Sequence, residues 1–154
     1  MKLLVVAVGK VRNAAIAAAI QEYEERAARY WPLEVHEVRE EPAKSLSPDL
    51  VREREGERLS DAVPKSAHLV ACDPGGKSKT SEEFSAWLQG ERERGHDVAF
   101  VIGGAYGLSE AVRSRARTRL SLAPWTLPHE LARLVLAEQL YRAGSIVKRE
   151  PYHK

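Results

Sequence analysis

The apolar positions of this chain follow two alternating patterns. Short runs rich in Val, Ile and Leu are typical of buried β-strands, and they occur at residues 3–8, 33–38, 67–72, 98–102 and, more weakly, 120–123. Between them, apolar residues recur at steps of three and four, the spacing of one helix face. These segments predict helices over 13–30, 48–62, 81–94, 109–117 and 128–143. The alternation predicts an α/β fold, a parallel-rich sheet with helices on both faces.

Polar residues mark where these helices begin. Asn13 is placed as an N-cap, and Ser81 and Ser109 each combine a capping side chain with acidic residues in the first turn, which the helix dipole favours. Pro128 suits the first turn of the last helix. Residues 39–48 are polar and contain two prolines, so a mobile loop is expected there.

Composition narrows the class of protein. The 154 residues predict a single domain over 1–154, and 44% hydrophobic with 30% charged residues is typical of soluble globular proteins. No apolar run approaches the ~20 residues that cross a bilayer, and the first run is too short for a signal peptide, so we expect a cytoplasmic protein without a membrane partner. Cys72 is the single cysteine and the five histidines lack paired ligand spacing, so no metal site is predicted.

Two segments predict a ligand pocket. Residues 102–108 follow a predicted strand and contain Gly103, Gly104 and Gly107, where the absence of a Cβ lets backbone approach backbone or a ligand. Residues 120–129 hold two prolines around a short apolar loop, whose backbone groups can meet the edge of a flat heterocycle while leucines cover its faces. Ligands of open α/β sheets bind beyond the carboxyl ends of strands. We therefore expect the site between strands 67–72 and 98–102 and loop 122–127.

Other nucleotide motifs fit poorly. The glycine spacing is G-G-x-x-G where a dinucleotide fold needs G-x-G-x-x-G, which argues against NAD or FAD and leaves a structural glycine turn as the alternative. Gly76-Lys77-Ser78 lacks the first glycine of a phosphate loop, and Pro74 interrupts it. Cys72 is interpreted as a small apolar residue of the pocket wall, because nothing in the sequence supplies a neighbouring base.

Basic residues concentrate in the last third of the chain, although the net charge of +2 is small. Arg113, Arg115, Arg117 and Arg119 either form a solvated face or face phosphates, which would offset their mutual repulsion. The tail Tyr152-His153-Lys154 is either a frayed terminus or a set of side chains that hold an RNA base and its phosphate.

Taken together, these segments resemble one known family over essentially the full length of the chain. The matching residues are Leu4 to Gly9, the polar helix around Arg52 to Arg58, Val101-Ile102-Gly103-Gly104, Gly107-Leu108, Thr126-Leu127-Pro128-His129, Glu138-Gln139-Leu140-Tyr141-Arg142-Ala143 and Tyr152-His153-Lys154. The chain is similar to the large-subunit (23S) rRNA pseudouridine-N3 methyltransferases, small members of the SPOUT superfamily of knotted, S-adenosylmethionine-dependent RNA methyltransferases.

The resemblance implies a C-terminal trefoil knot, a homodimer, S-adenosylmethionine as cofactor and the assembled ribosome as partner. Cofactor contacts map onto Cys72, Gly103, Leu122, Ala123, Pro124, Trp125, Thr126 and Leu127. Cys72 departs from the leucine expected in relatives, which should alter packing more than chemistry. The last predicted helix is apolar over more than one face, which favours a partner helix.

The implied reaction needs a base for the proton on pseudouridine N3 and a group that stabilises the resulting anion. His153 or His129 is the candidate base, Arg142 the candidate partner of the imide oxyanion or a phosphate, and Tyr152 a candidate stacking residue. Two alternatives stay open from the sequence: a non-catalytic RNA- or ribosome-binding module, which would leave the pocket unexplained, and a knotted methyltransferase that acts on tRNA.

Overall fold

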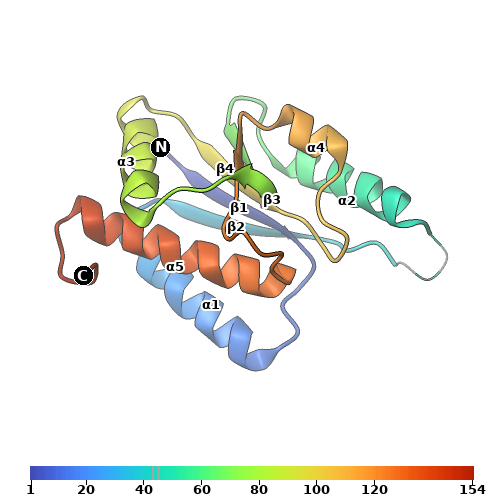
Figure 1. Cartoon of the computed structure of the whole chain (residues 1–154), viewed down its shortest axis with the longest axis horizontal. Coiled ribbons are helices and arrows are strands. Elements are labelled where there is room, and N and C mark those ends of the chain that lie inside the picture. Colours follow the sequence, from blue (N-terminus) through green and yellow to red (C-terminus); the bar gives the residue numbers. More distant parts are fainter. Residues whose placement is uncertain (43, 45) are drawn as a thin grey trace.

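The described residues form five strands and five helices in strict alternation (Figure 1), which confirms the predicted α/β class. The computed structural model describes residues 1–42, 44 and 46–154; Ala43 and Ser45, in the expected loop, lie outside the described residues. The elements are β1 (Leu3–Val8), α1 (Ala14–Ala27), β2 (Leu33–Val38), α2 (Pro48–Ala62), β3 (His68–Lys77), α3 (Ser81–Glu93), β4 (Val98–Ile102), α4 (Glu110–Arg115), β5 (Thr118–Leu120) and α5 (His129–Val147).

All the strands pair in parallel, in the order β2-β1-β4-β3-β5. Helices α1, α3 and α5 cover one face of the sheet, and α2 and α4 cover the other (Figure 1). Strands β1 and β4 are buried along their whole length, because a parallel sheet covered on both faces leaves no strand position for water. This is why their sequences read as unbroken apolar runs.

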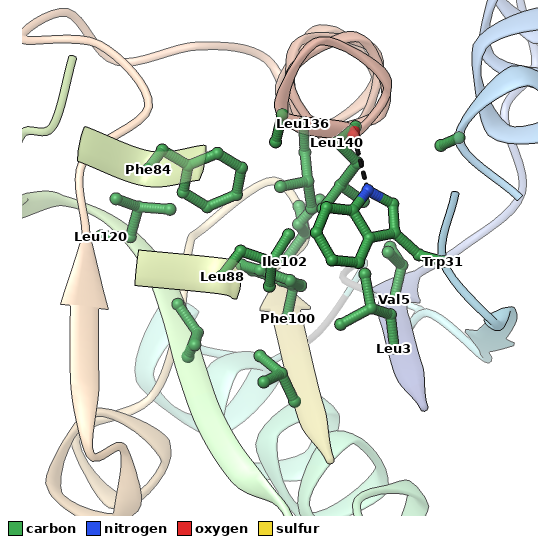
Figure 2. Packing of buried hydrophobic residues seen from close by; sticks show 14 of the residues in the cluster. Leu3, Val5, Trp31, Phe84, Leu88, Phe100, Ile102, Leu120, Leu136 and Leu140 are labelled. Atoms are coloured by element: carbon green, nitrogen blue, oxygen red, sulfur yellow. Dashed lines mark hydrogen bonds between the residues drawn. The ribbon is translucent and has the colours of Figure 1, made fainter. Parts of the chain in front are cut away.

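Alternate residues of β1 pack into two separate hydrophobic cores, one on each face of the sheet. Leu3 and Val5 face the layer of α1, α3 and α5, whereas Leu4 and Val6 face α2 and α4. In the larger core, Trp31 packs against α5 and its indole N–H donates to the carbonyl of Leu140 at 2.9 Å (Figure 2). That bond satisfies the one polar atom of a fully buried side chain.

The helix starts follow the predicted capping chemistry with one correction. Asn13 and Ser109 each accept a hydrogen bond from the backbone N–H three residues on, as predicted. Helix α3, however, is capped by Thr80 and not by Ser81. Thr80 and Glu83 form a reciprocal capping box, which frees the Ser81 hydroxyl to contact Gln139 of α5 at 2.8 Å.

The largest differences from the predicted boundaries lie in β3 and in the last third of the chain. Strand β3 continues to Lys77, five residues past the predicted end at Cys72, because Lys77 pairs with Leu120 of β5. Strand β5 spans Thr118–Leu120 and not 120–123, because its register is set by pairing with β3. Helix α5 continues past Gly144 to Val147. The glycine serves helix packing there: a Cβ at Gly144 would lie 2.3 Å from Cγ of Tyr30, so only glycine permits this approach to the end of α1.

Candidate functional site

A cavity of about 750 Å³ opens at the carboxyl ends of β3 and β4. Its walls come from the end of β3, the glycine turn that follows β4, the loop between β5 and α5, and the first turns of α5. This is the edge of the sheet where the sequence predicted the site. The lining is mostly apolar, with a few charged side chains at the mouth.

The glycine turn is closed by backbone contacts that side chains would prevent. The N–H of Gly107 donates to the carbonyl of Gly104 at 3.0 Å, and Gly107 has a φ of +80°. A Cβ at Gly103 would lie 2.6 Å from the carbonyl carbon and oxygen of Gly107. Both positions therefore need glycine, and the turn presents backbone to the cavity.

The loop before α5 forms the opposite wall. Of the predicted cofactor contacts, Cys72, Gly103, Leu122, Ala123, Trp125, Thr126 and Leu127 line the cavity, whereas Pro124 is not among the lining residues. Within the described part of the chain, the backbone N–H groups of Leu122, Ala123, Trp125, Thr126 and Leu127 have no hydrogen-bond acceptor, and Pro124 has no N–H. Unpaired donors beside an apolar cavity are suited to the polar edge of a ligand.

Burial raises the pKa of the Cys72 thiol to about 12. The thiol is therefore protonated at neutral pH and is a poor nucleophile. This agrees with its interpretation as part of the pocket wall.

The charged mouth of the cavity centres on Asp73, which the sequence did not single out. Its Oδ2 accepts hydrogen bonds from Nε and Nη2 of Arg119 at 3.1 and 2.7 Å. The same oxygen lies 3.3 Å from Nε of Arg113. Burial alone would raise the pKa of Asp73, but the bonds from Arg119 and the backbone N–H of Gly75 outweigh it and lower the pKa. The only sequence signal was the position of Asp73 directly after a buried run.

The four clustered arginines thus divide by function. Arg113 and Arg119 hold Asp73, while Arg115 donates to the carbonyls of Ser60 and Val63 at the end of α2, at 2.7 and 3.1 Å. Arg115 therefore satisfies helix-terminal carbonyls. Arg117, which directly precedes β5, is exposed.

Only one of the four candidate catalytic residues lies at the cavity. His129 begins α5 and lines the cavity. Arg142 lies about 20 Å further along the helix axis at 1.5 Å per residue, and Tyr152 and His153 follow the end of that helix. Figure 1 shows the C-terminus beyond the end of α5 that is remote from His129.

The remote residues form a cluster of their own, the tail cluster of Glu138, Arg142, Tyr152 and His153. Nε and Nη2 of Arg142 donate hydrogen bonds to Oε1 of Glu138 at 3.0 and 2.6 Å, and the Tyr152 hydroxyl donates to the same oxygen at 2.8 Å. The Arg142 guanidinium lies 4.8 Å from the Tyr152 ring centroid. Burial and the bond to Glu138 raise the pKa of Tyr152. Nε2 of His153 contacts Glu82 of α3 at 2.7 Å.

The residues that the structure describes form neither a membrane-spanning helix nor a metal-binding cluster. No helix there is long and apolar enough to span a membrane. Across the same residues, no three His, Cys, Asp or Glu side chains gather closely enough to hold a metal ion.

Comparison with known proteins places this architecture and cavity in one class. A family model described as "Predicted SPOUT methyltransferase" matches residues 1–153. A curated relative from Gemmatimonas aurantiaca, named ribosomal RNA large subunit methyltransferase H, is 60% identical over 154 residues and 100% of both chains. Proteins of the same name from Geobacter sp. and Listeria monocytogenes are each 43% identical, over 99% and 100% of both chains respectively. The chain belongs to the SPOUT methyltransferase family.

A solved structure supports the fold. A protein whose structure is titled "Crystal structure of an hypothetical protein" matches 94% of this chain and 81% of its own length, with a TM-score of 0.53 and 15% identity. The fold class predicted from the alternation of strands and helices is thus confirmed. The trefoil knot implied by the resemblance stays a prediction.

Proposed function

We propose that this methyltransferase transfers a methyl group from S-adenosylmethionine to N3 of a pseudouridine in large-subunit ribosomal RNA, on assembled ribosomes. Family membership supports the transfer of a methyl group. The names of the curated relatives support large-subunit ribosomal RNA as the acceptor. The observation that carries the proposal is the pairing of a glycine turn with the unpaired N–H groups of loop 122–127 across one apolar cavity.

The cavity suits a nucleoside-bearing donor. Loop 122–127 offers its N–H groups to the edge of a purine, Leu122 and Leu127 cover its faces, and Cys72 and Gly103 let backbone and a small side chain approach it closely. When bound, S-adenosylmethionine supplies an electrophilic methyl group on its sulfonium. The protein must then align that methyl with the attacking nitrogen and remove the proton from N3.

The chain offers two sets of residues for this proton transfer. His129 lies at the cavity itself and is in place to accept the proton. His153 is the alternative base, Arg142 stabilises the imide oxyanion, and Tyr152 stacks on the base, but these side chains lie in the tail cluster. Both sets serve one reaction only if the tail cluster of another copy approaches the cavity.

A homodimer provides that approach. Leu131 in the first turn of α5 is 38% exposed, and Trp125 in the adjoining loop is 78% exposed. Leu134 and Val135 beside them are only half-buried. Exposed apolar side chains next to the cavity favour a second copy packed there, and two copies also widen the surface available to a folded RNA.

The test is transfer of labelled methyl from S-adenosylmethionine to ribosomes that lack the modification. Matched ribosomes whose target pseudouridines remain uridine provide the control. Label confined to large-subunit RNA that contains pseudouridine is the expected result. Label on both ribosome preparations would disprove the pseudouridine target, and label on tRNA alone would replace ribosomal RNA as the substrate.

A further inference from the structure

A second hollow, of about 530 Å³, runs along β5, the edge strand of the sheet. We call it the edge groove. Its side-chain lining includes Lys77, Lys79, Trp87, Arg117, Thr118 and Arg119. It lies outside the cavity described above, and none of the reaction roles proposed so far uses it.

The edge groove is strongly basic. Lys77, Lys79, Arg117 and Arg119 are all exposed. Among the described residues, no carboxylate oxygen comes within 4.0 Å of the charged nitrogens of Lys77, Lys79 or Arg117; Arg119 alone is paired, with Asp73. The neighbouring acid, Glu91 of α3, is already engaged by Arg94, His68 and His96. A concave surface lined by one sign of charge concentrates the field on an oppositely charged ligand.

The backbone fixes where these cations stand. Cys72 and Lys77 both pair with Leu120, so residues 73–76 bulge out of the ladder between them. The N–H of Ser121 then donates to the carbonyl of Lys77 at 3.0 Å. At Gly76 a Cβ would lie 2.5 Å from the carbonyl carbon and oxygen of Arg119. The bulge is thus packed against β5, and it holds Lys77 and Arg119 on one surface.

The same bulge joins the edge groove to the methyl-transfer cavity. Asp73 and Pro74 line the cavity, whereas Gly75 and Gly76 line the groove. The Asp73 carboxylate links both sides, since it binds Arg113 of the cavity and Arg119 of the groove. A polyanion that lies in the groove therefore passes directly beside the cavity.

We propose that the edge groove binds the sugar-phosphate backbone of ribosomal RNA beside the target nucleotide, with Lys77, Lys79 and Arg117 on phosphates. This inference rests on the proposed function, whose acceptor it positions. Unpaired lysines and arginines in a groove suit phosphates because each contact releases a counterion. Trp87 and Thr118 complete a surface that fixes the register of the strand without reading its sequence.

The test compares two double variants with the same loss of charge. Lys79→Gln with Arg117→Gln removes two groove cations, and Arg29→Gln with Lys65→Gln removes two exposed cations elsewhere. For each, calorimetry measures S-adenosylmethionine affinity, and filter binding measures ribosome affinity over a series of salt concentrations. The groove variant should keep its donor affinity, bind ribosomes about tenfold or more weakly at low salt, and lower the slope of log affinity against log salt by about 1.5.

The outcomes separate the two proposals. A groove variant that binds ribosomes like the control variant, while the wild type methylates them, overturns the groove and leaves the methyltransferase assignment in place. A loss of donor affinity equal to the loss of ribosome affinity also overturns it, because the defect would then lie in the cavity. A wild type that methylates no ribosomal RNA refutes the proposed acceptor itself.

Discussion

At the scale of single residues, the cavity depends on positions where a side chain is excluded. Gly103 and Gly107 close the turn after β4 because their backbones meet where a Cβ would stand. The sequence indicated these glycines by their place after an apolar run. For Asp73 it carried only one signal, the position directly after a buried run, because the importance of Asp73 comes from Arg113 and Arg119, 40 and 46 residues further along the chain.

Replacing Gly103 with alanine should prevent the glycine turn after β4 from closing as it does in the structure. The new Cβ would lie 2.6 Å from the Gly107 carbonyl, so the turn must shift away from the cavity. We expect S-adenosylmethionine affinity to fall about tenfold or more, roughly 1.4 kcal/mol, as measured by calorimetry. Gly90→Ala is the control, because its nearest contact is an ordinary 3.4 Å and alanine favours a helix. Equal donor affinity in both variants would contradict the role of the turn.

Glu91 should make the free energy of unfolding depend on pH in the acid range. Burial opposes its ionisation, but hydrogen bonds from Arg94 and His96 outweigh it and lower its pKa to about 2. The ionised carboxylate therefore stabilises the fold above the unfolded-state pKa near 4.5, and this contribution disappears as pH falls from about 5 to 2.

Glu91→Gln should accordingly cost about 2–3 kcal/mol in urea unfolding at pH 7. The difference from wild type should shrink toward pH 3. Glu93→Gln on the exposed face of the same helix is the control. A difference that stays constant across this pH range would show that Glu91 acts only through its shape.

At the scale of elements, strands β1 and β4 match the predicted ranges because each is a continuous apolar run. Strand β2 also matches, because its Leu and Val residues span the same range among exposed polar residues. Strand β5 was misplaced because its bounds depend on the partner strand: Arg117 donates its N–H to Leu69, and pairing ends at Leu120. Helix α5 was predicted too short because Gly144 resembles a helix end, whereas it provides room for Tyr30.

Gly144→Ala tests that last explanation. Alanine would ordinarily stabilise a helix interior by up to about 1 kcal/mol relative to glycine, but here the Cβ would lie 2.3 Å from the Tyr30 ring. We expect a net loss of about 1–3 kcal/mol from overpacking, measured by urea unfolding. Gly90→Ala again serves as the reference and should be neutral or stabilising, and a stabilised Gly144→Ala would contradict close packing of α1 on α5.

At the scale of the whole molecule, the proposed site is divided. The cavity lies at one end of α5 and the tail cluster at the other, about 20 Å apart along the helix. Within one copy of the chain, His129 therefore lies far from Arg142, Tyr152 and His153. We propose that a homodimer reunites them, with one copy's tail beside the other's cavity and, by two-fold symmetry, the reverse.

Mixing two inactive variants tests this arrangement directly. At a donor concentration well below the dissociation constant of Gly103→Ala, that variant leaves its cavity nearly empty. His153→Ala removes the base of the tail cluster, so if that base serves the reaction neither homodimer should methylate ribosomes under these conditions. Randomly mixed dimers should recover about a quarter of the wild-type activity, because half the dimers are mixed and each holds one cavity and one tail that are intact. No recovery, with mixed dimers confirmed by mass spectrometry, would mean that each chain builds its own site.

The sequence by itself determined the α/β class, the strands β1, β2 and β4, and the segments that line the cavity. Burial on both faces of β1 and β4, the partial burial of Leu and Val in β2, and the need for glycine all leave local marks in a chain. Tertiary structure decided what depends on distant partners. The edge pairing of β5, the binding of Asp73 by Arg113 and Arg119, the edge groove, and the separation of the tail cluster from the cavity all arise from contacts between remote segments. A local sequence pattern does not indicate which remote segments come into contact.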